Sequence, residues 1–146
     1  MHNEGLKREV YNYWQQVPCG TELTTHQRYS RAYFEDIETK RYQIEPEIFS
    51  FAQFTRFHHK KVLEVGVGAG TDFMQWMRAG AQAYGIDLTD EAVEQVQQRC
   101  NVYGLQPVEV RVADAEALPY ASNFFDLTYS WGVIHHSPDM SRCLSE

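Results

Sequence analysis

Val62-Leu63-Glu64-Val65-Gly66-Val67-Gly68-Ala69-Gly70-Thr71-Asp72 is the stretch on which the fold of this chain depends. An apolar run over 61–65 leads into three glycines at alternate positions, and a helix-like segment follows them. This order predicts a strand, a tight turn and a helix N-terminus. A turn without side chains lets a ligand approach the main chain, where free N–H groups and the positive helix end face it. The stretch therefore indicates a loop that binds a nucleotide-type cofactor.

The composition is that of a single globular domain, with 146 residues, 43% of them hydrophobic and 23% charged. The net charge of −7 argues against a nucleic-acid partner, because binding a polyanion requires a basic surface. No segment approaches the roughly 20 apolar residues that span a bilayer, and the N-terminus lacks the apolar core of a signal peptide. Cys19, Cys100 and Cys143 have neither a metal-ligand nor a CxxC spacing, which indicates reduced thiols. We expect a cytoplasmic protein without metal, membrane or nucleic-acid partners.

Residues 1–60 form a distinct part of the chain, rich in aromatic and charged residues and poor in glycine. The patterns predict amphipathic helices over 6–16 and 26–41 and a third helix that begins near Pro46. We expect an N-terminal helical extension, followed by a cofactor-binding domain over 61–146. The extension packs against that domain or, alternatively, forms a lid over a ligand.

Strands alternate with helices from residue 61 onward, which predicts an α/β fold with a Rossmann-like, doubly wound parallel sheet. Thr71 or Asp72 is expected to cap the first helix of this part, and Thr89 the second. The expected strands are 61–65, 83–86, 108–112 and 125–130, and the expected helices are 71–78, one between Thr89 and Gly104, and one that begins at Ser137-Pro138.

Acidic residues follow the second and third expected strands. Asp87 closes the second strand, where a carboxylate can accept hydrogen bonds from two ribose hydroxyls. Asp114 follows the third strand and can accept from an adenine amine. Because the carboxyl ends of parallel strands meet at one edge of the sheet, these groups should surround one site. A dinucleotide fingerprint would need a third glycine at Thr71, so a nicotinamide oxidoreductase is the weaker alternative.

The span 62–136 resembles the cofactor half of a class I S-adenosylmethionine-dependent methyltransferase, from the small-molecule branch called type 11. VLEVGVGAGTD resembles the first motif of that family, YGIDLT its ribose motif, VADAEALPY its adenine motif, and FFDLTYSWGVIHHSPD the motif after its fourth strand. The resemblance implies S-adenosylmethionine as the cofactor and a small-molecule methyl acceptor. It also implies cofactor contacts from Glu64, Gly66, Val67, Gly68, Gly70, Thr71, Asp72, Asp87, Leu88, Asp114, Ala115 and Ser130.

Glu64 has two interpretations, a contact with the cofactor ammonium or a brace for the loop backbone. His135 and His136 are the candidates for a catalytic base, because an unperturbed imidazole titrates near neutral pH. At most one of these adjacent side chains should face the pocket, and the alternative is that they form its wall.

The family fold continues with three more strands, and the resemblance implies that this chain forms a partial sheet of order 3-2-1-4 with the fourth strand at an open edge. Such an edge can pair with another chain, so a homodimer through the fourth strand is expected as one outcome. The leading explanation is a fragment of a longer enzyme. The alternatives are a short dimeric form and a non-catalytic S-adenosylmethionine-binding or oligomerisation module.

Overall fold

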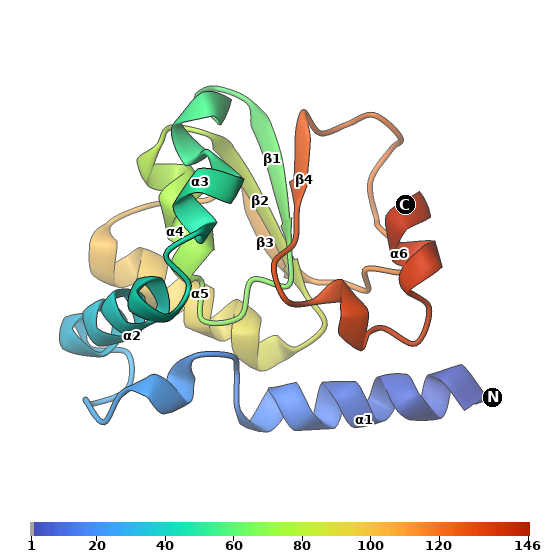
Figure 1. Cartoon of the computed structure of the whole chain (residues 1–146), viewed down its shortest axis with the longest axis horizontal. Helices are drawn as coiled ribbons and strands as arrows, with labels where there is room; N and C mark the ends of the chain where they lie inside the picture. Colours follow the sequence, from blue (N-terminus) through green and yellow to red (C-terminus); the bar gives the residue numbers. More distant parts are fainter. Residues whose placement is uncertain (1) are drawn as a thin grey trace.

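The structure is a computed structural model that describes residues 2–146, with side chains from residue 4 onward. Its centre is a sheet of four parallel strands in the order β3-β2-β1-β4, as predicted (Figure 1). The strands are β1 (Lys61–Val65), β2 (Gln82–Asp87), β3 (Glu109–Val112) and β4 (Leu127–Tyr129).

β1 lies at the centre of the sheet and explains the long apolar run in the sequence. Leu63 pairs with Tyr84 of β2 on one side and with Thr128 of β4 on the other. A parallel strand covered on both faces needs apolar side chains at successive positions, and four of its five residues are buried. This burial fixes β1 at the bounds that the sequence predicts.

Helices cover one face of the sheet, with α4 (Thr71–Arg78) and α5 (Asp90–Tyr103) packed beside α3 (Ile48–Ala52) (Figure 1). The core on this face contains Trp76, which is fully buried, together with Phe54 of the short helix η2 (Phe54–Phe57). The opposite face buries Leu63, Val65 and Ile86 beneath the segments that follow β3 and β4. The remaining helices are α1 (His2–Gln16), η1 (Thr21–Leu23), α2 (Arg31–Ile44), η3 (Ile134–His136) and α6 (Met140–Ser145).

The N-terminal extension packs against the domain, which is the first of the two arrangements that the sequence left open, and a lid over a ligand stays a prediction. α2 and α3 pack against the domain: Phe34 and Ile37 contact Ala69, and Ile48 joins the core of the sheet. α1 instead runs along the carboxyl ends of the strands, at the lower edge in Figure 1. The division of the chain at residue 60 stays a prediction. No helix of the described chain is both long enough and apolar enough to cross a bilayer.

The starts of α2 and α6 differ from the prediction, and local capping explains both differences, whereas α4 has the predicted bounds and a different cap. α2 begins at Arg31 instead of residue 26, because the Ser30 side chain accepts from the Tyr33 N–H and caps the helix there. The expected cap of α4 by Thr71 or Asp72 is wrong, because Gly70 is the N-cap and both residues lie in the first turn.

The last helix also starts later than predicted. Asp139 caps α6 through the N–H of Arg142, so that the helix begins at Met140 and not at Ser137. The predicted Thr89 cap of α5 is confirmed, with Thr89 accepting from the Ala92 N–H.

Candidate functional site

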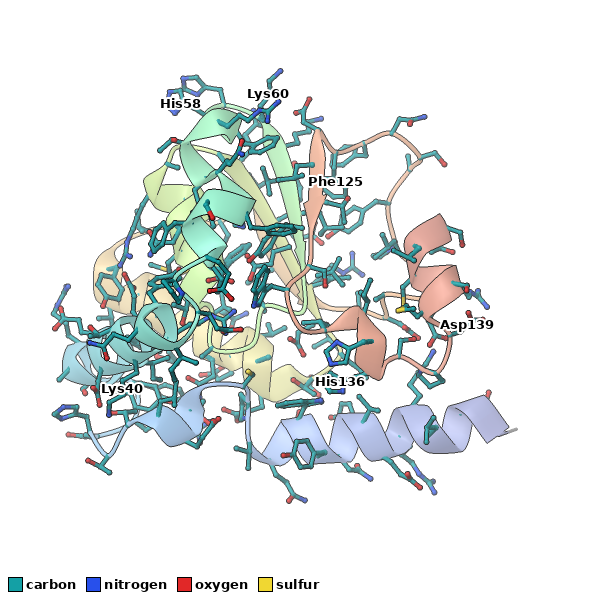
Figure 2. All side chains as sticks on the ribbon, in the orientation of Figure 1. Lys40, His58, Lys60, Phe125, His136 and Asp139 are labelled. Carbon is teal, nitrogen blue, oxygen red and sulfur yellow. The ribbon has the colours of Figure 1, made fainter. Side chains whose placement is uncertain are left out.

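A pocket lies at the carboxyl edge of the sheet, between the glycine loop (66–70) and α1. All four strands contribute to it through the residues at their ends or just beyond them, as expected for a doubly wound sheet. His136 lies between the segment after β4 and α1 (Figure 2). The predicted residues that line the pocket are Glu64, Gly66, Val67, Gly68, Thr71, Asp72, Asp87, Leu88, Asp114, Ala115 and His136.

Three predicted site residues are not among those that line this pocket: Gly70, Ser130 and His135. Gly70 begins α4, and Ser130 borders a second groove along β4, where its hydroxyl is buried without a partner in the described chain. The centroid of the His135 ring lies 3.9 Å from that of His136, with the two rings tilted by 40°. Of the two histidines, the structure brings only His136 to the pocket.

The glycine loop is shaped for close packing. Gly66 has a φ of 81°, and a Cβ there would lie 2.3 Å from Val133, so only glycine fits. The N–H groups of Gly66, Gly68 and Gly70 donate to Ile86 O, Asp87 Oδ2 and Val67 O, at 2.8, 3.1 and 2.8 Å. The expectation that these glycine N–H groups are free is therefore wrong.

The Asp87 carboxylate already accepts hydrogen bonds from the glycine loop and from Thr89. Its Oδ1 accepts from the N–H and the hydroxyl of Thr89, at 3.0 and 2.9 Å, and its Oδ2 accepts from Gly68. Burial raises the pKa of Asp87, although these three bonds act in the opposite direction. A carboxylate offers about four acceptor positions, so roughly one remains for a ligand. Two ribose hydroxyls would require one internal bond to open.

Glu64 lies under the loop and is 3% exposed. The Trp76 indole N–H donates to its Oε2 at 2.9 Å, which supports the bracing interpretation. Glu64 also lines the pocket, so a contact with a ligand stays open as the other interpretation. Burial raises the pKa of Glu64 well above its ordinary value, and the nearby Asp72 carboxylate adds to the effect.

Asp72 anchors a polar network that the sequence did not predict. It accepts from the Arg41 guanidinium at 3.0 Å, from the Tyr42 hydroxyl at 3.0 Å and from the Tyr129 hydroxyl at 2.9 Å. Arg41 comes from α2 and lines the pocket. Burial alone would lower the pKa of Arg41, but Asp72 and Glu45 hold it above the usual value, so its charge is permanent.

A second unpredicted cluster joins α1 to the segments after β3 and β4 at the border of the pocket, which we call its mouth. Lys7 of α1 lies 2.6 Å from both Asp114 and Glu116, and the Ser137 hydroxyl also donates to Glu116. Lys7, Val10 and Trp14 share one face of α1 and all line the pocket. Their spacing of three and four residues in an amphipathic helix is a signal that could have identified them as one face of the pocket.

The His136 side chain contacts Trp14 on this face of α1. Its ring lies 5.4 Å from the ring of Trp14, in an edge-on arrangement. Burial, and to a lesser extent the charge of His135, lower the pKa of His136. The imidazole is therefore neutral at physiological pH and can accept a proton.

Comparison with known proteins identifies relatives of this chain. The family model described as a methyltransferase domain (type 11) matches residues 63–146. A malonyl-[acyl-carrier protein] O-methyltransferase from Erwinia billingiae is 34% identical over 100 residues, which are 68% of this chain and 37% of that protein. A ubiquinone biosynthesis O-methyltransferase from Methylococcus capsulatus is 33% identical over 81 residues, 55% of this chain and 34% of that protein. The chain spans about a third of the length of these curated relatives.

A solved structure shares the fold. Magnesium protoporphyrin IX methyltransferase from Synechocystis PCC 6803, determined with bound SAM, superposes with a TM-score of 0.68 at 20% identity. The superposition covers 96% of this chain and 69% of that one, N-terminal extension included.

Proposed function

Because this chain belongs to the class I S-adenosylmethionine-dependent methyltransferases, we propose that the pocket beneath α1 binds S-adenosylmethionine for methyl transfer to a small-molecule or biosynthetic-intermediate acceptor. The observation that carries the proposal is the convergence of Glu64, the glycine loop, Asp87 and Asp114 on one pocket.

The chemistry of the lining fits this cofactor from end to end. Asp87 can hold a ribose hydroxyl. Asp114 accepts from Lys7 and from the Glu116 N–H, so about two of its four acceptor positions remain for the adenine amine. Leu88 supplies an apolar wall for the ring. Arg41 offers a permanent cation for the carboxylate, in place of the glycine N–H groups that are already in use. When bound, the cofactor supplies an activated methyl group on a sulfonium.

The acceptor side lies where the segment after β4 meets α1. Trp14, Trp131, Val133 and His136 line it, so the wall is largely apolar with one neutral imidazole. We assign His136 the role of a base that removes a proton from a weakly acidic hydroxyl, while the walls align the acceptor and exclude water. Two of the relatives are O-methyltransferases, which supports an oxygen acceptor.

Protection of Cys19 from alkylation tests where the cofactor binds. Cys19 is an exposed thiol that lines the pocket, whereas Cys143 borders the separate groove along β4. S-adenosylhomocysteine should slow iodoacetamide labelling of Cys19 and leave Cys143 unchanged, as measured by peptide mass spectrometry. NADH should protect neither thiol. Equal labelling of Cys19 with and without S-adenosylhomocysteine would contradict the proposed site.

The alternative function is a non-catalytic, S-adenosylmethionine-binding module that oligomerises. In the described chain β4 pairs with β1 alone, and the groove beside it is lined by Phe51, Phe57 and Leu127. We propose a homodimer through this edge, which a mass measurement by light scattering tests; a monomer at micromolar concentration would exclude it. A dimer that binds cofactor without methyl transfer would favour the module.

The three free cysteines support a cytoplasmic location.

A further inference from the structure

We propose that Arg99, on α5, is a positioning residue for the cofactor loop, and that Glu38 of the N-terminal extension enables it to act. Arg99 is not among the residues that line the pocket. The inference rests on the proposed function, because it concerns how the loop is prepared for S-adenosylmethionine.

The guanidinium of Arg99 binds the end of the glycine loop on the side away from the pocket. Arg99 is fully buried, and its Nη1 donates to the Ala69 carbonyl at 3.1 Å and to the Thr71 hydroxyl at 2.9 Å. These two acceptors lie on either side of Gly70, and both residues line the pocket. One nitrogen thus fixes the point where the loop becomes α4.

The peptide between Ala69 and Gly70 is consequently held at both ends. Its carbonyl accepts from Arg99, and its N–H donates to Val67 O at 2.8 Å. Gly70 has no room to shift toward α5, because even a Cβ there would lie 3.0 Å from Val96. The Ala69 N–H, on the preceding Gly68–Ala69 peptide, meets no acceptor among the described residues, and Ala69 lines the pocket. Fixing the Ala69 carbonyl therefore limits the movement of the residue that carries this N–H.

The other end of the guanidinium is bound by the N-terminal extension. Nη2 of Arg99 donates to Glu38 Oε2 at 2.7 Å and to the Phe34 carbonyl at 3.4 Å, both on α2. In the described chain Glu38 is the one carboxylate within salt-bridge distance of Arg99. A buried charge is tolerated only when it is paired. Glu38 therefore stabilises the buried Arg99 cation behind the loop. Through Arg99, α2 affects how tightly the loop binds a cofactor, although Glu38 does not line the pocket.

A fixed loop favours binding because less conformational freedom is lost when the ligand arrives. A purely structural role for Arg99 would change the amount of folded protein and its stability. A positioning role changes the affinity of the protein that remains folded. Calorimetry separates the two effects, because unfolded molecules reduce the stoichiometry while the dissociation constant reports on folded molecules.

The matched pair of variants is Arg99→Lys and Arg78→Lys. The Arg99→Lys variant keeps the charge but cannot reach both the loop and α2, since an ammonium lacks the forked geometry of a guanidinium. Arg78 binds the same carboxylate, with Nη1 at 2.6 Å from Glu38 Oε1, but makes no bond to the loop. Titration with S-adenosylhomocysteine should show dissociation constants about 10-fold weaker for Arg99→Lys and within about 2-fold of wild type for Arg78→Lys.

A wild-type dissociation constant for folded Arg99→Lys would overturn the positioning role, and so would equal weakening by both variants. If Arg99→Lys does not fold, the dissociation constant of Glu38→Gln tests the positioning role instead. Its amide keeps one acceptor but loses the charge, and affinity should fall about threefold with full stoichiometry, whereas unchanged affinity would overturn the inference. No binding by the wild-type protein would instead refute the proposed function.

Discussion

The ammonium of Lys7 lies 2.6 Å from Oδ2 of Asp114, although 107 positions separate the two residues in the sequence. The same ammonium contacts Glu116, which also accepts from Ser137. Three segments that border the pocket, α1 and those after β3 and β4, are thus joined at its mouth. A ligand amine that binds Asp114 must share this carboxylate with Lys7, so cofactor exchange and movement of α1 should be coupled.

Replacement of Lys7 by Met should loosen α1 without unfolding the protein. We expect faster amide hydrogen exchange over residues 4–16 and faster dissociation of S-adenosylhomocysteine, because α1 loses its bonds to the mouth. Global stability should change by about 1 kcal/mol, since Lys7 and Asp114 are partly exposed and the buried Glu116 keeps its bonds from Ser137 and Asp139. Lys40→Met is the control, because Lys40 bonds to Asp36 and Leu23 away from the pocket. Unchanged exchange in Lys7→Met would contradict the lid.

The sequence was sufficient for features that depend on neighbouring residues. Burial on both faces defines β1, and the Thr89 side chain defines the start of α5. Those features require only the local pattern of apolar and capping residues. The order of the sheet followed from the family resemblance and not from the local pattern.

Contacts between distant segments could not be predicted in the same way. Arg41 reaches Asp72 across 31 positions, and Arg99 reaches Glu38 across 61. Each of these residues has an ordinary helical position in the sequence, and only packing brings the pair together. The use of the glycine N–H groups within the loop likewise depends on its folded geometry, which spacing alone does not specify.

Glu64→Gln should stabilise the protein above neutral pH. The pKa of Glu64 in the folded state lies above the unfolded value of about 4.3. The folded state therefore binds this proton more tightly, and the associated stability is complete below about pH 4.3 and is lost as the pH rises through the folded pKa. Glutamine remains neutral and can still accept from Trp76.

Urea unfolding at pH 5.5 and pH 8.0 measures this effect. The variant should lose less stability than wild type between the two values, by about 1 kcal/mol or more. Glu35→Gln, at an exposed position of α2, is the control and should behave as wild type. Parallel pH dependence in Glu64→Gln and wild type would show that Glu64 titrates normally.

His136→Asn should reduce kcat by about 100-fold or more, because the base is lost, while affinity for S-adenosylhomocysteine stays within about 2-fold. The lowered pKa of His136 places the rising limb of kcat below the ordinary histidine value of about 6.5, with a plateau at higher pH where the imidazole is neutral. Methyl-transfer rates from pH 5 to 8 test this with an oxygen acceptor. His135→Asn is the neighbouring control, and an equal loss of kcat in that variant would contradict the assignment to His136.

Calorimetric titration of the wild-type chain with S-adenosylhomocysteine, repeated with Asp87→Asn and Asp90→Asn, is the most direct test of whether this pocket binds the cofactor. Asp87 lines the pocket, whereas Asp90 lies in the first turn of α5 and bonds to Tyr11. We expect one site per chain, about 10- to 100-fold weaker binding in Asp87→Asn through the loss of charged hydrogen bonds, and unchanged binding in Asp90→Asn. No heat of binding in the wild-type protein, or equal affinity in Asp87→Asn, would contradict this expectation.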